Sequence, residues 1–472
     1  GDVYKRQVKG AFKMIFHGRE EELKTFKAFY EAPGLKGAIL YGRRRQGKSC
    51  LLRKSREDFK GSAIYYQCLK DVDRKNASSL IEVCKSKIKD FHRVGVPSFS
   101  DVLAEIFYHS KKQPILLILD EYPYLQDREK IDSFLQRLRD NNQDSKRKII
   151  LSGSYVDIRT SLIDIANPLH GRFALKRKIN SFDYKDSSLF YPDATDEEKI
   201  GYYSVFGGTP YYLARIDPKI GLEENIKKLF LNPFSPLERE INSTIETECS
   251  KITNATFLLS IIASGKHSYT DINSVFRSQV KNSDINYLLS RLIDRNYVQK
   301  EHALNDKDKR KAYYKLSDNL ISFYYHIIYP NIEQKTFLSP DRFFDVYRKE
   351  KLYSTYIPMI FEKICKEYLL RKNRQGKLNP FFTRIGSYTY NNPKEKTNGQ
   401  FDIVTEDLNG LIFYECKYTS EKVGMDVISE EKEQLSKAGL TYYRLGFFSK
   451  SGFQIPVGKE DYILYNLHDL FC

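Results

Sequence analysis

The pattern of apolar and polar positions changes character near residue 180. Before that point, short apolar runs alternate with segments in which apolar residues recur every three or four positions. A short continuous apolar run is typical of a buried strand, and the longer spacing is typical of a helix. Strands are expected at 38–41, 63–67, 114–120 and 148–152, and helices at 78–91 and 131–140. Because strands alternate with helices, this part predicts an α/β fold with a parallel sheet.

After residue 180 helical spacing dominates, and strands return only toward the carboxyl end. Three predicted helices between 256 and 295, followed by a hairpin at 297–316, are typical of a winged helix. The segment 330–345, which contains Pro330 and Pro340, predicts a linker. Beyond it, a helix and mixed strands predict another α/β domain. The expected domains are 14–180, 181–250, 251–330 and 346–472.

Composition narrows the function classes. The formal net charge of +16 favours a polyanionic partner, nucleic acid above all, although a generally basic proteome would give the same value. Seven widely spaced cysteines lack metal-ligand spacing and indicate free thiols in a reducing cytoplasm. No apolar run approaches the roughly 18 residues of a membrane span, so no membrane partner is expected. Residues 1–13 lack the apolar region of a signal peptide, and we expect Met14 to be the natural start.

A phosphate-binding loop follows the first predicted strand. Residues 42–49 read Gly-Arg-Arg-Arg-Gln-Gly-Lys-Ser and match G-x-x-x-x-G-K-[ST] at every fixed position. Lys48 is expected to reach the β- and γ-phosphates of ATP, and the Ser49 hydroxyl to bind Mg²⁺. Main-chain amides of the loop would surround the phosphates. The expected ATP contacts are Gly42, Arg43, Arg44, Arg45, Gln46, Gly47, Lys48, Ser49 and Cys50.

An acidic pair ends the apolar run at 115–119. In an open α/β sheet, ligands bind at the carboxyl ends of the strands, so Asp120 and Glu121 are expected beside the loop. Asp120 would hold Mg²⁺ through its water shell, and Glu121 would orient and deprotonate the attacking water. The alternative is a strand end that carries two solvated acids.

Two further positions are candidates for sensing phosphate. The strand at 148–152 runs into Ser152-Gly-Ser154, where a hydroxyl can contact the γ-phosphate, or where the serines merely cap the strand. Arg172 could stabilise charge that develops in the transition state, or it could be a surface arginine. If Arg172 acts in trans, a ring or a dimer is required; if it acts in cis, none is.

Six short motifs in order carry a family resemblance. They are Phe16-His-Gly-Arg-Glu-x-Glu-Leu23, the phosphate-binding loop, Leu119-Asp-Glu121, Leu151-Ser-Gly-Ser154, Pro168-Leu-His-Gly-Arg172 and Gly207-Gly-Thr-Pro-Tyr-Tyr-Leu213. Over 14–330 the chain resembles the archaeal-type ATPase family of the STAND branch of P-loop NTPases, which is related to AAA+ proteins. The resemblance implies that Gly18 and Arg19 lie near the adenine and that Pro210 lies in a helical lid, 181–250, over the nucleotide. It also implies an ATP-gated switch with slow hydrolysis.

The predicted winged helix offers a DNA-binding surface. Its helix at 283–295 carries Arg291 and Arg295, and the turn of the hairpin carries Lys307, Lys309, Arg310 and Lys311. A recognition helix can enter the major groove while a basic wing follows the phosphates. The apolar residues of the same helix, however, are expected to lie in a core, so packing between domains is the alternative.

A predicted hairpin near the carboxyl end carries acids and a lysine. Glu415 and Lys417 share one face of the strand at 411–418 because strand side chains alternate, whereas Cys416 points away. Asp402, on the neighbouring strand, can approach them. The two carboxylates could bind Mg²⁺ or Mn²⁺, and Lys417 could orient a water toward a phosphodiester. The alternative is an amphipathic hairpin with a solvated face.

Over residues 350–450 this pattern resembles the PD-(D/E)xK nuclease superfamily, as found behind ATPases of this family. The resemblance implies a third acid from the preceding helix, 357–370, for which Glu362 is the candidate. The chain departs from the superfamily motif in that Phe401, and not proline, precedes Asp402. Residues 343–400 carry twelve basic residues against five acidic ones, a balance that suits a phosphodiester backbone.

The favoured interpretation is an ATP- and Mg²⁺-dependent ATPase whose nucleotide state controls a C-terminal nuclease-like domain that binds DNA. One alternative is an ATP-gated switch that binds DNA or a protein partner through an inactive nuclease fold. Another is a regulator that reads DNA sequence through Arg291 and Arg295. Self-association is compatible with each of them.

Overall fold

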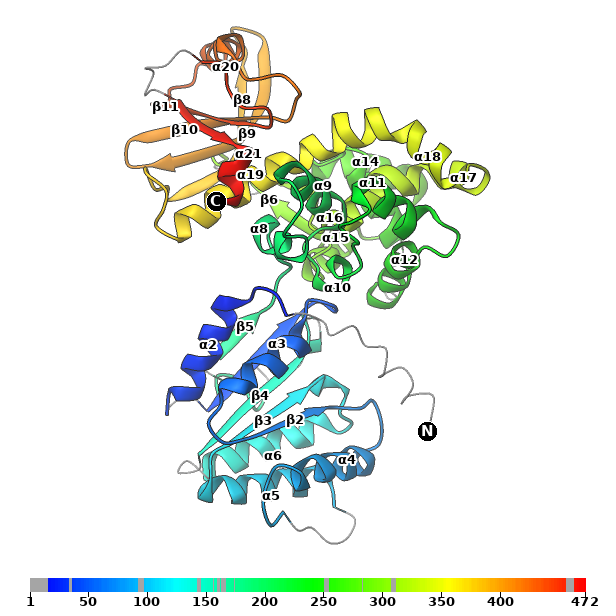
Figure 1. Cartoon of the computed structure of the whole chain (residues 1–472), viewed down its shortest axis with the longest axis vertical. Coiled ribbons are helices and arrows are strands. Elements are labelled where there is room, and N and C mark those ends of the chain that lie inside the picture. Colours follow the sequence, from blue (N-terminus) through cyan, green and yellow to red (C-terminus); the bar gives the residue numbers. More distant parts are fainter. Residues whose placement is uncertain are drawn as a thin grey trace. The chain divides into compact units, whose positions relative to one another are not determined.

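The computed structural model divides the chain between Ser181 and Phe182 into two compact units (Figure 1). It describes residues 16–33, 36–91, 97–141, 146–155, 157–158, 162, 167–173, 175–249, 254–281, 283–306, 311–455 and 462–472. The leader, Met14 and three wing residues, Lys307, Lys309 and Arg310, lie outside the described residues. Within the described part of the chain, no helix is long and apolar enough to cross a membrane.

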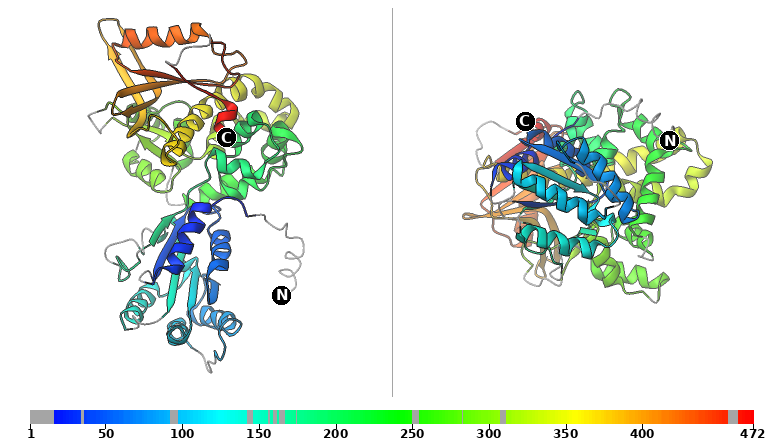
Figure 2. Two further views of the ribbon diagram at one scale, coloured as in Figure 1. Left: turned by 60° about the vertical axis from the view of Figure 1, so that its left-hand side comes forward. Right: turned by 90° about the horizontal axis from the view of Figure 1, so that it is seen from below.

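The first unit is built on a five-stranded parallel sheet in the order β2-β3-β4-β1-β5, with helices on both faces (Figures 1 and 2). Its strands are β1 (Gly37–Gly42), β2 (Ser62–Gln67), β3 (Ile115–Asp120), β4 (Arg147–Ser154) and β5 (Leu175–Lys178). Its helices are α2 (Glu20–Glu31), α3 (Lys48–Ser55), η1 (Arg56–Asp58), α4 (Asp73–Lys85), α5 (Phe99–Lys112), η2 (Tyr122–Tyr124) and α6 (Arg128–Asn141). The predicted α/β fold with a parallel sheet is therefore confirmed.

Burial on both faces explains why the sequence pattern located these strands. Every residue of β3 is buried. Leu116 and Ile118 join a core cluster with α2 and α3, whereas Leu117 and Leu119 join a cluster with α4, α5 and α6. A strand that is covered on both faces has a continuous apolar sequence, because neither set of alternating side chains meets water.

The second unit begins with helices and one hairpin. The first elements are α8 (Tyr184–Ser187), η3 (Ser188–Phe190), α9 (Asp196–Phe206), α10 (Pro210–Leu213), α11 (Gly221–Ile226), η4 (Lys227–Leu231) and α12 (Pro236–Glu248). The next are α13 (Ala255–Ala263), α14 (Tyr269–Gln279), α15 (Ile285–Asp294) and the antiparallel strands β6 (Val298–Glu301) and β7 (Tyr313–Leu316). Three helices and a hairpin thus lie where the sequence predicted a winged helix.

The predicted linker at 330–345 is wrong. After α16 (Asn319–Phe323), η5 (Tyr324–Ile328) and η6 (Tyr329–Asn331), the chain forms α17 (Ile332–Phe337), α18 (Pro340–Tyr347) and η7 (Arg348–Tyr356). Phe343 and Phe344 are buried in the core of the unit. Pro340 lies in the first turn of α18, a position where the missing amide hydrogen is not needed. The proline marked the start of a helix and not a loop.

The C-terminal part is a mixed sheet in the order β12-β11-β10-β9-β8. Its elements are α19 (Ile357–Arg374), β8 (Arg384–Asn392), β9 (Thr397–Asp407), β10 (Gly410–Lys417), α20 (Met425–Ala438), β11 (Arg444–Ser449), β12 (Tyr462–Asn466) and α21 (Leu467–Phe471). Ile412 and Tyr414 of β10 join the core that contains α19, whereas Phe413 joins the core that contains α20. The two helices therefore cover opposite faces of the sheet.

Candidate functional sites

The phosphate-binding loop connects β1 to α3 at the carboxyl edge of the first sheet. Arg45 has φ 69° and Gly47 has φ 81°, so the backbone turns through the left-handed region twice before α3 begins. Lys48 is 5% exposed, and its Nζ donates to the carbonyl oxygens of Gly42 at 2.9 Å and Arg43 at 3.0 Å. The lysine is thus held over the loop by the loop's own backbone. Ser49 and Cys50 follow in the first turn of α3.

Asp120 and Glu121 lie beside this loop. Asp120 is fully buried at the end of β3 and accepts a hydrogen bond from Ser152 Oγ on the neighbouring strand β4. Glu121 has a left-handed backbone, with φ 53°. Burial raises the pKa of Glu121, the nearby charge of Asp120 adds to the increase, and the charge of Lys48 opposes it. Glu121 therefore interacts electrostatically with both Asp120 and the loop lysine.

Tyr65 is a member of this cluster that the sequence analysis missed. Its hydroxyl donates to Asp120 Oδ2 at 2.5 Å and also interacts with the Ser49 hydroxyl. Burial and the Asp120 carboxylate together raise the pKa of Tyr65. The residue lies on β2, next to β3 in the sheet. The sequence places Tyr65 near the end of a predicted strand. Only the strand order of the fold shows that this strand lies next to the one that ends in Asp120.

The motif that contains Gly18 and Arg19 is attached to the same loop. Gly18 and Arg19 both have positive φ, and Arg19 is 8% exposed. Arg19 Nη2 donates to Gln46 O at 3.2 Å and to Asn180 O at 2.7 Å. Gln46 Nε2 in turn donates to Ser181 Oγ at 2.9 Å. These bonds join the start of the described chain, the phosphate-binding loop and the end of the first unit. Arg44 points elsewhere, toward the Tyr124 hydroxyl at 3.1 Å.

Arg172 lies away from the loop within its own unit. Its Nη2 is 3.7 Å from Asp140 Oδ2, at the last turn of α6. Residue 172 precedes β5, whose first residue Leu175 pairs with Ala38 near the start of β1. The loop follows the other end of β1, and a strand of six residues spans about 20 Å. Action of Arg172 in cis is therefore not compatible with this arrangement, and action in trans stays a prediction.

The lid residues belong to the second unit. Gly208 packs against the Phe182 backbone so closely that a Cβ would lie 1.9 Å from Phe182 O, which explains a glycine here. Pro210 starts α10 as its first residue. That Pro210 covers the nucleotide stays a prediction.

The region predicted as a winged helix uses much of its surface for packing inside the second unit. Arg295 is only 7% exposed and donates to the Arg291 carbonyl. The segment after β6 is bonded to the edge strand β8, since Leu304 N donates to Ser387 O at 2.6 Å and Asn305 Nδ2 donates to Thr389 O at 2.7 Å. Among the described residues, the arrangement therefore favours the packing alternative over base contacts by Arg295.

Asp402 and Glu415 lie where two strands separate. The antiparallel ladder of β9 and β10 ends with Ile403 opposite Tyr414, so Asp402 and Glu415 occupy the next positions. Gly386 of β8 pairs with Val404 of β9, and Tyr388 pairs with Phe401, so two steps along β8 correspond to three steps along β9. The extra residue is a β-bulge, and Asp402 lies within it. Bulges often re-aim side chains beside functional sites, so regular alternation does not predict the direction of Asp402.

Four of the predicted C-terminal residues act on one another. Glu415 Oε1 lies 2.7 Å from Lys417 Nζ, and both side chains are about one-third exposed. Burial raises the pKa of Glu362, on α19, to about 8; the charges of Asp402 and Glu415 add to the shift, and Lys315 opposes it. Within the described residues, however, no three acidic, histidine or cysteine side chains are arranged to hold a metal ion. The four side chains are neighbours, and binding of a metal ion by the carboxylates of Asp402 and Glu415 stays a prediction.

Glu431 on α20 is a neighbour that the sequence analysis did not single out. It is 7% exposed, and its pKa is raised to about 7, first by burial and then by the charge of Glu415, with Lys417 opposing. Ile428, Glu431 and Leu435 share one helical face that packs on the sheet. An acid on an otherwise apolar face was the signal available in the sequence.

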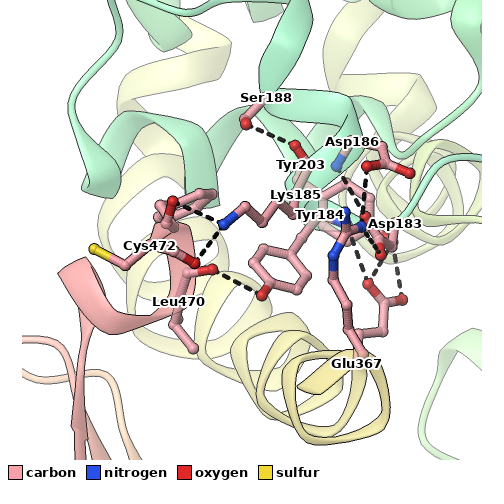
Figure 3. A network of polar contacts seen from close by, with 11 residues as sticks. Asp183, Tyr184, Lys185, Asp186, Ser188, Tyr203, Glu367, Leu470 and Cys472 are labelled. Atoms are coloured by element: carbon pink, nitrogen blue, oxygen red, sulfur yellow. Dashed lines mark hydrogen bonds and ion pairs between the residues drawn. The ribbon is translucent and has the colours of Figure 1, made fainter. Parts of the chain in front are cut away.

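A polar network holds the segment that follows Ser181 inside the second unit (Figure 3). Arg371 Nη1 bonds Asp183 Oδ2 at 2.7 Å and Asp186 Oδ1 at 2.9 Å. Glu367, also on α19, accepts from the Tyr203 hydroxyl at 2.9 Å and from Tyr184 N at 3.2 Å. At the other side, the Tyr184 hydroxyl donates to Leu470 O at 2.8 Å and Lys185 Nζ donates to Phe471 O at 3.0 Å. The segment is thereby fixed to both ends of the C-terminal domain.

The sheet order, the loop and the acidic pair define a P-loop NTPase. Residues 16–216 match a family described as an ATPase domain predominantly from Archaea, so this part of the chain is similar to archaeal-type ATPase domains. Residues 324–433 match a second family, described as archaeal and bacterial proteins of unknown function. That range contains Glu362, Asp402, Glu415 and Lys417, so the C-terminal cluster lies within it.

Several known proteins are similar to the chain. An uncharacterised protein of Methanocaldococcus jannaschii, MJECL04, is 28% identical over 378 residues, which cover 79% of this chain and 82% of that protein. Among solved structures, the Walker-type ATPase PABY2304 of Pyrococcus abyssi is 19% identical with a TM-score of 0.49, covering 66% of this chain and 96% of its own. The ORC2 protein of Aeropyrum pernix, in complexes with ADPNP and ADP, is 13% identical with a TM-score of 0.45, covering 70% and 98%.

Proposed function

We propose that this protein binds and hydrolyses ATP with Mg²⁺, and that its nucleotide state controls a C-terminal nuclease-like domain that binds DNA. The observation that carries the first part is the cluster of Lys48, Ser49, Tyr65, Asp120 and Glu121 at one sheet edge. A loop with two left-handed residues and a buried lysine fits a phosphate chain. The Ser49 hydroxyl is connected to the buried Asp120 carboxylate through the Tyr65 hydroxyl, and these oxygen atoms fit a magnesium ion.

Each residue of the cluster has a separate task. Lys48 would bind phosphate oxygens, and Ser49 and Asp120 would hold the metal, with Tyr65 fixing the Asp120 carboxylate. Glu121 would accept a proton from water, and its raised pKa makes the carboxylate a stronger base. Bound ATP·Mg²⁺ supplies the phosphoanhydride bond and the cation that offsets its charge.

Glu121→Gln tests this assignment in the full chain. The variant should retain ATP·Mg²⁺ in a direct titration but lose hydrolysis, because it keeps the shape of the site without the base. Glu129→Gln, on α6, is the matched control and should behave as the wild type. Hydrolysis that continues at the wild-type rate in Glu121→Gln would remove Glu121 from the proposal.

The covalent connection between the units supports control by nucleotide. Asn180 and Ser181 accept hydrogen bonds from Arg19 and Gln46, next to the phosphate-binding loop. Only two residues later, Asp183 is bonded to Arg371 of α19, the helix that also carries Glu362. A change of loop conformation with nucleotide would therefore act on a short segment that is anchored in the C-terminal domain. A ligand shifts such an equilibrium only as far as it binds two states differently.

Arg371→Ala tests the control step. In the wild type, ATP with Mg²⁺ should change the affinity for a labelled oligonucleotide relative to ADP. The variant should hydrolyse ATP normally but lose this difference, whereas Arg374→Ala, an exposed arginine on the same helix, should retain it. If the ATP–ADP difference survives unchanged in Arg371→Ala, the connection does not carry the control.

DNA cleavage is a second candidate activity of the C-terminal domain. The Glu415–Lys417 pair beside Asp402 and Glu362 favours it, because carboxylates and a lysine serve phosphodiester chemistry. The expected result is nicking of plasmid DNA with Mn²⁺ that is abolished in Asp402→Ala and Lys417→Ala but kept in Glu433→Gln, an exposed control on α20. Nicking that survives in both alanine variants excludes the activity, and no nicking by the wild type favours a binding domain with an inactive nuclease fold.

A further inference from the structure

A cavity of about 240 Å³ lies between the β6–β7 hairpin, the start of α14 and the strands β8 and β9. The hairpin contributes Glu301 and Lys315 to its lining, the segment before α14 contributes His267, and the strands contribute Ser387 and Gln400. The cavity therefore joins the three-helix region to the sheet of the C-terminal domain. The proposed function assigns no role to this cavity.

One side of the cavity leads to the candidate carboxylates. Gln400 Nε2 donates to Asp402 Oδ1 at 2.8 Å, so a cavity-lining side chain contacts one of the four predicted residues directly. Lys315, on the facing hairpin, is close enough to Glu362 that its charge lowers the pKa of that carboxyl against the effect of burial. The cavity thus borders the cluster from the side of the hairpin.

The hairpin wall is fixed to the C-terminal domain at several points. Arg384 Nη2 donates to Leu304 O at 2.5 Å, in addition to the bonds from Leu304 and Asn305 to β8. Lys366 Nζ of α19 lies 3.1 Å from Glu301 Oε1. Lys363 of the same helix donates to Ser317 O at 3.0 Å, just after β7. Lys315 is therefore carried on a wall that keeps its place beside the sheet.

The chemistry of the lining suits one nucleotide. The Lys315 side chain is 41% exposed, and its Nζ is 3.8 Å from Glu301, whose other oxygen already has the closer Lys366. Its ammonium group can therefore donate to a phosphate. His267 bonds Tyr314 O through Nδ1, and burial lowers its pKa, so the neutral ring leaves Nε2 as an acceptor for a sugar or base. Asp271 adds a second acceptor at that end.

We propose that this cavity binds one nucleotide of an unpaired DNA strand, with Lys315 contacting its phosphate and the adjoining phosphodiester directed toward Asp402 and Glu362. A cavity of about 240 Å³ is comparable in size to one nucleotide and too small to enclose a base pair. The proposal rests on the proposed function, because it assigns the DNA structure that the C-terminal domain recognises. Lys315 is thereby a residue of the C-terminal site that comes from the hairpin and not from the nuclease-like sheet.

The hairpin itself offers a matched control. Lys315 shares a face with Glu301 and Tyr313, whereas Lys300 pairs with Tyr314 on the opposite face and is exposed. Lys315→Ala and Lys300→Ala each remove one positive charge from the same hairpin, so long-range attraction of DNA changes equally. A contact inside the cavity distinguishes the two variants.

Binding of a labelled oligo-dT and of a duplex to the full chain, in Ca²⁺ over a series of salt concentrations, tests the proposal. We expect the wild type to prefer the single strand. Lys315→Ala should weaken single-strand binding about tenfold and reduce the salt dependence by about 0.7 of an ion. Lys300→Ala should stay within about twofold of the wild type, and Lys315→Arg should restore most of the affinity, because arginine also donates to phosphate.

The outcomes separate this proposal from the proposed function. DNA binding with equal losses in Lys315→Ala and Lys300→Ala, or with no preference for the single strand, overturns the cavity assignment and leaves DNA binding intact. A gain in Mn²⁺ affinity in Lys315→Ala with unchanged DNA affinity also overturns it, since Lys315 would then serve only as a counter-charge to Glu362. If the wild type binds neither the single strand nor the duplex, both the cavity assignment and the proposed binding of DNA by the C-terminal domain are overturned.

Discussion

The nucleotide site and the C-terminal cluster are both built at strand ends, but their side chains are arranged to different degrees. In the first, Lys48 is held by two loop carbonyls, and Asp120 is held by Tyr65 and Ser152. In the second, Asp402 is bonded to Gln400 and Glu415 to Lys417, and no three acids are set to hold a metal within the described residues. The first site is preorganised, and the second is not.

The difference follows from what builds each site. A phosphate-binding loop is backbone held by glycine and its neighbours, so its donors converge whether or not an anion is present. A group of carboxylates repels itself, and three of them approach only when a cation or a proton offsets the charge. Burial raises the pKa of Glu362 to about 8, and repulsion by Asp402 and Glu415 adds to the increase.

Among the substitutions that test this difference between the two sites, replacement of Lys48 should have the largest effect, a loss of ATP hydrolysis. Lys48→Ala removes the charge that acts on Glu121 and that, in the proposed function, binds phosphate, so we expect ATP hydrolysis to fall by about 10² or more. Lys54→Ala, on the same helix but exposed, is the control and should hydrolyse normally. Unchanged turnover in Lys48→Ala would mean that ATP is hydrolysed at another site.

Replacement of Tyr65 tests whether the nucleotide site is preorganised by side chains that hold its proposed metal ligand Asp120. Tyr65→Phe removes the hydroxyl that fixes Asp120, and we expect about a tenfold loss of ATPase activity at low Mg²⁺ that high Mg²⁺ partly restores. Tyr66→Phe removes a hydroxyl from the next position, where it bonds Asn76, and should leave the Mg²⁺ dependence unchanged. If both variants show the same Mg²⁺ dependence as the wild type, Tyr65 has no part in the metal site.

Glu367 predicts a pH dependence of stability in the second unit. Burial raises its pKa to about 7, with the charge of Asp183 adding and Lys363 opposing, so the protonated form is favoured in the folded state. Its stabilising contribution is full below about pH 4.5 and is lost as the pH rises through about 7. Glu367→Gln should remove this dependence, which we expect to be on the order of 1–3 kcal/mol.

Denaturant unfolding of the wild type and of Glu367→Gln at pH 5, 6, 7 and 8 measures the effect. The wild type should lose stability over this interval relative to the variant. Glu350→Gln, in η7, provides a control without this buried network. A constant difference between wild type and variant across the four pH values would contradict the prediction.

Replacement of Arg172 should have the smallest effect on stability and on ATP hydrolysis when the chain is monomeric. Its ion pair with Asp140 is partly exposed, so Arg172→Ala should change stability by less than about 0.5 kcal/mol. Its place at the opposite edge of the sheet predicts hydrolysis within about twofold of wild type at high dilution. A large loss under those conditions would contradict the position of Arg172, whereas a loss that appears only at high protein concentration would indicate action in trans.

The sequence predicted the first unit well because its signals are local. The loop motif fixes Gly42, Gly47, Lys48 and Ser49 by spacing, and β3 has an apolar run that ends in Asp120 and Glu121. The lateral partners of these residues depend on strand order, which spacing does not encode. Tyr65 and Ser152 come next to Asp120 only because β2 and β4 flank β3.

The C-terminal site was predicted as a set of residues but not as an arrangement. Alternation correctly separated Cys416 from Glu415 and Lys417, since Cys416 interacts with Cys365 on α19. Alternation says nothing of the bulge at Asp402, of Glu431 or of Lys315 from the hairpin. These depend on an extra residue in one strand and on contacts between segments that are distant in sequence.

The helical course of residues 332–347 also bears on how the chain can be dissected. A cut in this region would run through α17 and α18 and would detach Phe343 and Phe344 from the core they share with the neighbouring helices. Removal of everything after it would also uncover Leu304 and Asn305, which are bonded to β8. Fragments made at this point would lose solubility for reasons unrelated to DNA, so point substitutions in the intact molecule are the more informative experiments.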